Sequence, residues 1–238
     1  MDEHIAARLL RLNREFYQTF AESFSETRER LQPGVLRIME EMPRTASILD
    51  LGCGNGELAR ALAGRGHSGR FVGLDASEGL LAAARTAQNH PDARFENADL
   101  ADPAWHARLS PDFDIIVAFA VLHHIPGDAL RLRLVRDMRS LLCEDGWAAV
   151  SAWDFMASER LKGRVVAWDA IELRGQDVDK GDYLLDWRRG GYGLRYVHHF
   201  SEDELGDLAI RGGFAIEQSF RSDGEGGRLG LYQVWRMT

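Results

Sequence analysis

Three glycines at alternate positions, Gly52, Gly54 and Gly56, separate a short apolar run from a helical pattern. The apolar run 47–51 is typical of a buried strand, and residues 57–63 have the propensity and spacing of a helix. A strand that turns through glycines into a helix lets a ligand approach the backbone, because no Cβ is in the way, and the helix N-terminus offers free N–H groups. The stretch therefore predicts a nucleotide site, although glycine turns also arise for purely steric reasons.

The same alternation of strand and helix repeats along the chain. Short apolar runs predict further strands, and the run 113–119 is apolar on both faces, as a central parallel strand should be. The expected strands are 70–75, 93–99, 113–119 and 146–153, the expected helices are 77–89 and 127–142, and the last two strands are 214–220 and 229–235. This order predicts a doubly wound α/β fold, with a mostly parallel sheet of seven strands that ends in an antiparallel hairpin at its edge.

The N-terminus and one internal stretch depart from this rhythm. Apolar groups at helical spacing predict helices over 5–22 and 35–42, which form an N-terminal helical cap, residues 1–44. Residues 154–200 hold two apolar helical patches and a glycine-rich stretch, and we expect an insertion that caps the site rather than a separate domain. The whole chain, 1–238, is then a single domain.

The charge balance limits the classes of partner. The 238 residues carry a net charge of −8, which argues against a broad basic face for nucleic acid but leaves room for a local basic patch. Because there is no apolar run of about 18 residues and no secretory signal, we expect a cytoplasmic protein and no membrane partner. Cys53 and Cys143 predict neither a disulfide framework nor a metal site, and the adjacent His198 and His199 have no Cys or His at ligand spacing.

Two acids lie where the ligand of a doubly wound sheet is expected. Asp75 ends the second expected strand and Asp99 ends the third. Ligands of such sheets lie at the carboxyl ends of the strands, where an acid after the second strand can accept hydrogen bonds from a ribose diol. Asp99 is then placed to reach an adenine amino group. Each Asp alone would more often be a helix cap or a turn residue, and only their joint placement favours an adenosyl site.

The spacing of the glycines selects among nucleotides. A dinucleotide-binding turn reads G-x-G-x-x-G, whereas here the third glycine comes one residue early, and no P-loop lysine is present. The stretch resembles instead the first motif of class I S-adenosylmethionine-dependent methyltransferases. Across about residues 45–153, the similar segments are 50–56, 73–75, 97–99 and 113–124, followed by 141–147 with Asp-Gly where the family usually has Pro-Gly.

This resemblance implies a Rossmann-like methyltransferase fold and S-adenosyl-L-methionine as the cofactor. The first two glycines would lie under the methionine moiety, with Asp75 on the ribose. Asp99 and Leu100 would hold adenine, and the backbone of Ala118 would lie beside the methionine. The residues implied in cofactor binding are Tyr17, Arg28, Gly52, Cys53, Gly54, Asp75, Ala76, Asp99, Leu100 and Ala118.

Two stretches that flank these motifs resemble one particular family within the superfamily. The stretch 16–28, with Phe16-Tyr17 at its start and Thr27-Arg28 at its end, resembles the N-terminal motif of the tRNA wobble-uridine (5-carboxymethyluridine) methyltransferases, whose helix and Thr-Arg close over the cofactor. Residues 194–205 are similar to their Arg-Tyr-Tyr-His-x-Phe-x-x-x-Glu-Leu stretch, with Tyr-Val-His in place of Tyr-Tyr-His. The resemblance implies a carboxymethyl group on tRNA as the methyl acceptor and a small activator subunit as a candidate partner.

Methyl transfer to a carboxylate acceptor needs few catalytic groups from the protein. The sulfonium is an activated leaving group and a carboxylate is ionised near neutral pH, so alignment is the main requirement, and an arginine that holds the carboxylate by two hydrogen bonds would suffice. The catalytic candidates are Arg28, Arg195 and His123, with Arg188 and Arg189 as further arginines near the acceptor. Aromatic residues that would stack on a base are Tyr17, Tyr192 and Tyr196. The alternative for these residues is solvated surface charge or simple packing.

Two other functions stay open at this point. The acidic balance favours a methyltransferase for a small-molecule carboxylate or hydroxyl rather than for tRNA. A non-catalytic, cofactor-binding scaffold is a further alternative, which the intact glycines and Asp75 disfavour.

Overall fold

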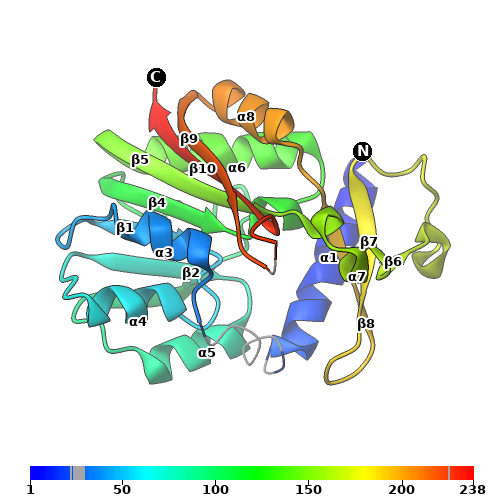
Figure 1. Ribbon diagram of the computed structural model, residues 1–238, viewed down its shortest axis with the longest axis horizontal. Helices are drawn as coiled ribbons and strands as arrows, with labels where there is room; N and C mark the ends of the chain where they lie inside the picture. Colours follow the sequence, from blue (N-terminus) through cyan, green and yellow to red (C-terminus); the bar gives the residue numbers. More distant parts are fainter. Residues whose placement is uncertain (22, 24–29, 225) are drawn as a thin grey trace.

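A twisted sheet of seven strands forms the larger part of the computed structural model, which describes residues 1–21, 23, 30–224 and 226–238 (Figure 1). The strand order is β3-β2-β1-β4-β5-β10-β9, and only β10 runs antiparallel to its two neighbours. The strands are β1 (Ile48–Leu51), β2 (Phe71–Asp75), β3 (Ala93–Asn97), β4 (Phe113–Phe119), β5 (Leu142–Trp153), β9 (Phe214–Ser222) and β10 (Gly230–Met237). The expected doubly wound, Rossmann-like sheet with an antiparallel hairpin at its edge is confirmed.

Helices cover both faces of this sheet, because alternate strand residues point to opposite sides and both sides are apolar. Ile48 packs with Leu58 and Leu81 on one face, and the next residue, Leu49, packs with Leu134 on the other. The first face carries α3 (Pro33–Met39), α4 (Glu57–Gly64) and α5 (Glu78–Ala87), and the second carries α6 (Asp128–Leu141) and α8 (Glu202–Arg211). A short 3-10 turn, η2 (Leu122–His124), joins β4 to α6.

Several strand ends differ from their expected positions, among them those of β3 and β5. β3 ends at Asn97, so Asp99 lies in the loop beyond it. β5 begins at Leu142, and its pairing with β4 shifts register between Phe113 and Ile115. The polar bulge around Glu144 hides the early start of β5 from the hydrophobic pattern. Ser77 caps α5, since its Oγ accepts a hydrogen bond from the N–H of Leu80 at 3.4 Å.

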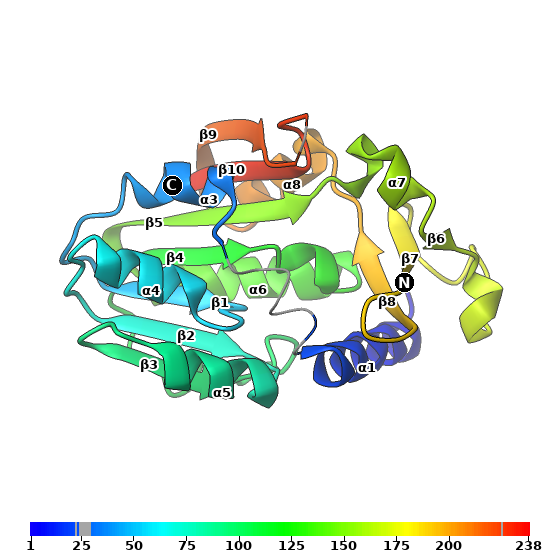
Figure 2. The same cartoon turned by 60° about the horizontal axis from the view of Figure 1, so that its bottom comes forward.

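Residues 154–200 form a second, smaller sheet rather than a pair of helices (Figure 2). Its antiparallel strands are β6 (Val165–Val166), β7 (Asp182–Trp187) and β8 (Gly193–His198), and its flanking turns are η3 (Phe155–Ala157), α7 (Glu159–Lys162) and η4 (Trp168–Ile171). We call β6, β7 and β8 the cap sheet. Helical structure in the described residues of this segment is confined to the short α7, η3 and η4, so the two expected helical patches occur only as short pieces, and the cap sheet was not predicted.

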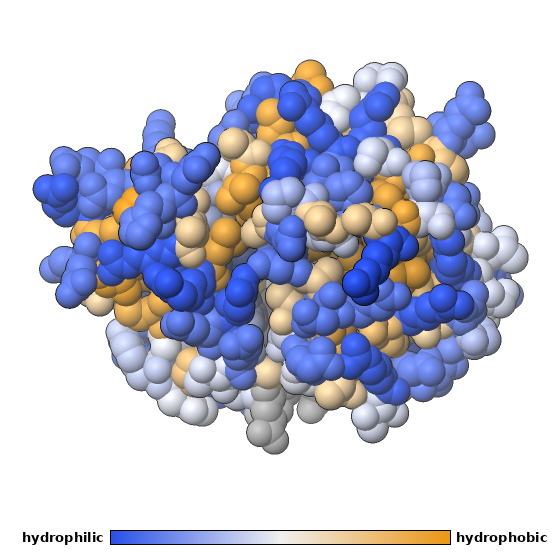
Figure 3. Space-filling model, turned by 180° about the vertical axis from the view of Figure 1, so that it is seen from behind, coloured by the Kyte–Doolittle hydropathy of each residue, from blue (hydrophilic) through white to orange (hydrophobic). Residues whose placement is uncertain are grey.

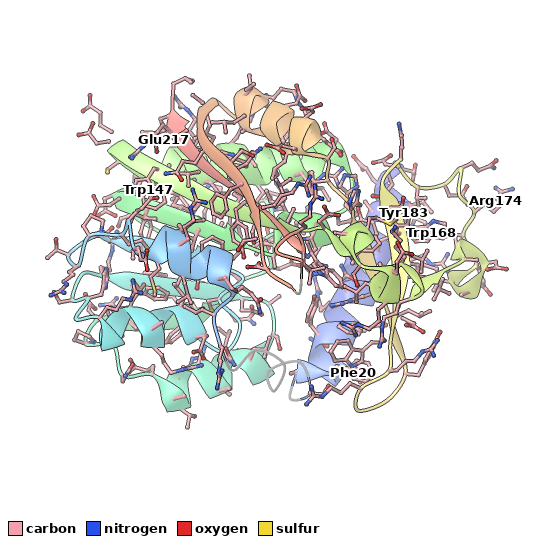
Figure 4. All side chains as sticks on the ribbon, in the orientation of Figure 1. Phe20, Trp147, Trp168, Arg174, Tyr183 and Glu217 are labelled. Atoms are coloured by element: carbon pink, nitrogen blue, oxygen red, sulfur yellow. The ribbon has the colours of Figure 1, made fainter. Side chains whose placement is uncertain are left out.

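The N-terminal helix α1 (Glu3–Thr19) packs along β8. Asn13 closes the free edge of that strand, because its side-chain amide donates to the carbonyl of Tyr196 at 3.1 Å and accepts from the N–H of the same residue at 2.8 Å. Phe20, labelled in Figure 4, follows α1 and lies so close to β8 that a Cβ on Gly193 would meet its ring at 2.4 Å. By contrast, α3 packs on the large sheet, so within residues 1–44 it is α1 that lies against the cap sheet.

In the ranges that the structure covers, no helix combines the length and the apolar character that a bilayer crossing requires.

Candidate active site

A cavity of about 690 Å³ lies at the carboxyl ends of β1, β2 and β4, between the large sheet and the cap sheet. The face shown in Figure 3 is hollowed between these two parts. Its walls come from the glycine turn, the ends of the parallel strands, α1 and the cap sheet. The volume lies within the range of small-molecule sites, roughly 300–1,000 Å³.

The glycine turn forms the floor of the cavity. Gly52, Gly54 and Gly56 have φ values of 71°, 55° and 76°, a left-handed conformation that side chains rarely tolerate. A Cβ on Gly52 would lie 2.5 Å from the Cγ2 of Val121, whereas a Cβ on Gly54 would meet nothing within 4 Å. The turn therefore needs glycine for its conformation, and its backbone at Gly54 is open to a ligand.

Asp75 stands beside this turn in a fixed orientation. Its carboxylate accepts hydrogen bonds from the backbone N–H groups of Gly54 at 2.9 Å and Ser77 at 2.8 Å. The side chain lines the cavity together with Ala76 and Cys53. Burial raises the pKa of the Cys53 thiol, with the Asp50 charge as a further cause, so this thiol is neutral. The sequence thus placed Asp75 correctly at the cavity, where it also orders the turn.

Asp50 is a cavity residue that the sequence analysis did not single out. It is 4% exposed, and no hydrogen bond or ion pair links its carboxyl to the described part of the chain. Burial raises the pKa of this carboxyl well above its usual range, and the charge of Asp75 raises it further. An acid at the end of the first strand, directly before the glycines, was the available signal.

The third acid, Asp99, lies at the far end of the cavity. Its carboxylate pairs with Arg14 of α1 and accepts a hydrogen bond from the N–H of Ala101 at 3.0 Å. Leu100 is 8% exposed and also lines the cavity. Ala118 does not: it is fully buried inside β4, and the cavity wall is made by the residues that follow it, beginning with Phe119. The expected contact of Ala118 with the cofactor stays a prediction, and in this structure the cavity lining begins one residue further along the chain.

The two adjacent histidines of η2 both line the cavity. The Nε2 of His124 lies 2.7 Å from the hydroxyl of Tyr17, and its Nδ1 lies 3.3 Å from the carbonyl oxygen of Tyr196. Because a carbonyl can only accept, Nδ1 donates to it, and in the neutral ring Nε2 then accepts from the hydroxyl. His123 is 1% exposed and its Nδ1 accepts from the N–H of Trp153 at 3.3 Å. The sequence selected His123, whereas the histidine that is joined to Tyr17 is its neighbour.

Arg195 is a buried cation with no counter-ion among the described residues. It is 7% exposed and lines the cavity, and its guanidinium carbon lies 4.8 Å from the ring centre of Trp153, 5.4 Å from Phe16 and 5.6 Å from Trp187. Its Nε has no hydrogen-bond partner, and no carboxylate of the described residues forms an ion pair with it. An unpaired buried charge is costly, so the site is suited to a ligand that brings a negative group to this guanidinium.

Two buried acids of the cap sheet, Asp182 and Asp186, have other partners than Arg195. Asp186 pairs with Arg164 and Arg188, at 3.5 Å and 2.7 Å. Asp182 accepts from the hydroxyl of Tyr196 and contacts the Nδ1 of His198, each at 2.7 Å. Tyr196 is thereby fully buried and absent from the cavity lining, so of the two expected roles, stacking on a base and packing the cap, it has the second.

The other predicted residues divide between the cavity and its surroundings. Arg188, Arg189 and Tyr17 line the cavity, and Tyr192 is 65% exposed on the loop between β7 and β8. Arg28, expected at both the cofactor and the acceptor, lies outside the described residues, as does most of the stretch 22–29. No cluster of three or more potential metal-ligating side chains occurs in the ranges that the structure describes.

Charge divides the cavity lining into two halves. The half formed by the large sheet carries the acids Asp50, Glu57, Asp75, Asp99 and Asp223, while Arg14 and Arg30 line the cavity from the N-terminal segment. The half formed by residues 160–195 carries Arg160, Arg164, Arg188, Arg189 and Arg195, against the single acid Asp186. Such a cavity can hold a cation and an anion side by side.

Comparison with known proteins agrees with this geometry. The family model described as "Methyltransferase domain" matches residues 23–219. A candidate methyltransferase of Encephalitozoon cuniculi is 27% identical over 84% of this chain and 86% of its own length. A trans-aconitate 2-methyltransferase of Acidovorax ebreus is 40% identical over 45% of this chain, and a tRNA (carboxymethyluridine(34)-5-O)-methyltransferase of Saccharomyces cerevisiae is 29% identical over 58%. The matches cover only 40% and 46%, respectively, of these last two proteins.

Solved structures share the fold. The 1,6-didemethyltoxoflavin-N1-methyltransferase of Burkholderia thailandensis, solved with its substrate and S-adenosylhomocysteine, has a TM-score of 0.68 and 20% identity, covering 100% of this chain and 91% of that one. The complex of the Haloferax volcanii Trm112 methyltransferase activator with its candidate methyltransferase contains a chain with a TM-score of 0.66 and 15% identity, covering 94% and 96%. The chain therefore belongs to the methyltransferase-domain family and is an S-adenosylmethionine-dependent methyltransferase.

Proposed function

We propose that S-adenosylmethionine lies on the acidic half of the cavity. The open backbone at Gly54 would face the methionine part, and Asp75 would accept hydrogen bonds from the ribose diol. Asp50 would face the ammonium group, because its buried carboxyl has no partner in the described chain and the cofactor is a cation. Asp99 and Leu100 would border adenine at the far end.

We propose further that the methyl acceptor is a carboxylate held by Arg195. A carboxylate oxygen attacks the methyl carbon, the bond from that carbon to sulfur breaks, and its electron pair stays on sulfur, so no proton moves and no general base is needed. Arg195 would bind the carboxylate by charge-assisted hydrogen bonds and aim it at the methyl group. The observation that supports this assignment is the buried guanidinium of Arg195, which lines the cavity and has no counter-ion in the described part of the chain.

Two kinds of acceptor fit this proposal. The first is a carboxymethyl group on tRNA wobble uridine, in line with the yeast relative and with the exposed Arg188 of the cavity lining. The second is a small-molecule carboxylate, in line with the trans-aconitate relatives and the net charge of −8. For the first, an activator subunit is a candidate partner, since the Haloferax neighbour is bound to one. The single-domain organisation and the cytoplasmic location stay predictions.

The proposal is tested by the chemistry of the product. The protein is incubated with methyl-labelled S-adenosylmethionine and one of two acceptors. The first is tRNA that carries 5-carboxymethyluridine without a methyl ester, and the second is trans-aconitate. A methyl ester is cleaved by mild alkali and releases volatile methanol, whereas ether and amine methyl groups are stable. We expect label that mild alkali releases from one of the two acceptors. Alkali-stable label would refute the carboxylate assignment. Alkali-labile label on only one of the two acceptors identifies that acceptor as the substrate.

A further inference from the structure

The cavity has a second group of arginines, apart from Arg195, that the transfer reaction itself does not need. Arg164 follows α7 and Arg188 follows β7, and both line the cavity. Their side chains are 30% and 69% exposed, so they stand at the mouth rather than at the bottom. Arg160, also exposed, lines the same mouth.

One buried acid holds these arginines in place. The carboxylate of Asp186 is 3% exposed, and its Oδ2 accepts from the Nε of Arg188 at 2.7 Å. Its Oδ1 lies 3.5 Å from an Nη of Arg164 and has no hydrogen-bond partner among the residues that the structure describes. The backbone adds a further link, because the N–H of Asp186 donates to the carbonyl of Arg164 at 2.9 Å.

Asp186 leaves much of the arginine donor capacity unused. It engages only the Nε edge of Arg188, so the terminal nitrogens of that guanidinium have no partner in the described chain. One carboxylate also balances only one of two cations, and the pair keeps a net charge of +1 before Arg160 is counted. Two guanidinium groups anchored by one acid form a preorganised anion site, since planar arginines bind carboxylate and phosphate oxygens in pairs.

We propose that the methyl acceptor carries a second anionic group, besides the carboxylate at Arg195, and that Arg164 and Arg188 bind it. This inference rests on the proposed function. It makes the acceptor a polyanion: either a small acid with two or more carboxylates, or a nucleotide whose phosphate lies next to the carboxymethylated base. Both kinds of acceptor share a second anionic group, which would bind at the mouth of the cavity although the protein has a net negative charge.

The test is a binding experiment on the whole chain saturated with S-adenosylhomocysteine, which cannot transfer a methyl group. Two matched pairs of probes are titrated by calorimetry. The small-acid pair is trans-aconitate, with three carboxylates, and crotonate, with one. The RNA pair is an anticodon stem-loop that carries 5-carboxymethyluridine and the free 5-carboxymethyluridine nucleoside, which has no phosphate. We expect the wild-type protein to bind the polyanionic member of one pair at least tenfold more tightly, and that pair identifies the source of the second anion.

Substitutions assign this preference to the two arginines. Arg188→Gln and Arg164→Gln should each lower the affinity ratio of the responsive pair by threefold or more, and Arg188→Lys, which keeps the charge, should retain part of it. Arg174→Gln is the matched control, since Arg174 is an exposed arginine at the far side of the cap sheet and is absent from the cavity lining (Figure 4). Thermal unfolding identifies any variant that fails to fold. If a glutamine variant does not fold, the affinity ratio of Arg188→Lys is compared with that of the wild type instead.

The proposal is overturned if neither polyanionic probe binds, if the ratio is near one in both pairs, or if Arg164→Gln and Arg188→Gln leave it unchanged. Failure of the carboxylate assignment looks different, because it appears as alkali-stable product in the transfer assay. If the product is an alkali-labile methyl ester but the affinity ratio is near one in both pairs, only the inference about Arg164 and Arg188 is refuted.

Discussion

The guanidinium carbon of Arg195 lies 4.8 Å from the ring centre of Trp153, so a cation from the cap sheet rests on an aromatic ring from the end of β5. Contact with an aromatic face stabilises a cation by about 0.5–2 kcal/mol, which offsets only part of the cost of burying it. The contact also fixes where the guanidinium points, and it joins the cap to the large sheet at the cavity. The arrangement leaves the hydrogen-bonding edges of Arg195 for a ligand.

The first prediction concerns this arginine. Arg195→Lys keeps a positive charge but loses the planar pair of donors, and we expect kcat/KM for a carboxylate acceptor to fall by roughly 10- to 100-fold, which corresponds to the ~1.5–3 kcal/mol of a charged hydrogen bond. The KM for S-adenosylmethionine should change little, because the cofactor is assigned to the acidic half. Steady-state kinetics with each substrate varied in turn measures both values. Arg94→Lys, an exposed change on β3, is the control.

Asp75 gives a second prediction. Asp75→Ala removes the carboxylate that would bind the ribose and that also orders the turn through Gly54 and Ser77, so we expect the affinity for S-adenosylmethionine to fall by 10-fold or more, about 1.4 kcal/mol. Calorimetric titration measures it, with Glu96→Ala on the exposed side of β3 as the control. An unaltered affinity would show that the ribose assignment is wrong.

A third prediction follows from the raised pKa of Asp50. Burial favours the neutral carboxyl, whereas a bound cationic cofactor favours the carboxylate, so binding should release a proton. The affinity for S-adenosylmethionine should then increase as the pH rises through the pKa of Asp50 in the free protein and level off above it. Titrations in buffers of different ionisation enthalpy count the proton released. Asp50→Asn should abolish this release, and a release that survives the substitution would exclude Asp50 as its source.

The sequence predicted those parts of the site that lie on regular elements of the large sheet. The glycine turn and Asp75 could be predicted because each lies at the end of a buried strand. The apolar runs reveal these strands, and the residue types that follow them indicate the turn and the acid. Arg195 was predicted only as one arginine among several, since nothing in its spacing shows that three aromatic rings from distant segments surround it. The cap sheet was missed because polar and apolar residues are mixed in β7, where Asp182 and Asp186 are buried through long-range pairing.

A buried pair of histidines, away from the cavity, provides a further relationship with a measurable consequence. The Nδ1 of His67 lies 2.7 Å from the Nε2 of His90. The other nitrogen of His67 faces the carbonyl oxygen of Ala46 at 3.0 Å, and the Nδ1 of His90 accepts from the N–H of Asp92 at 3.1 Å. Only neutral rings satisfy this chain, in which His90 donates to His67 and His67 donates to the carbonyl. A proton on either ring would set two N–H groups against each other.

The last prediction is that this pair destabilises the fold in mild acid. Burial lowers the pKa of both His67 and His90, and the repulsion between the rings lowers that of His90 further. Below the ordinary histidine pKa of about 6.5 the unfolded chain binds protons that the folded chain refuses, so the free energy of unfolding should decrease as the pH falls, by up to about 1.4 kcal/mol per pH unit for each ring. Above that pH the contribution of the pair is fully present. Urea unfolding of the wild type and of His90→Gln between pH 7.5 and 5 measures the slope, which should be shallower in the variant. Exposed His4 provides the matched His4→Gln control, and equal slopes in all three proteins would rule out the pair as the cause.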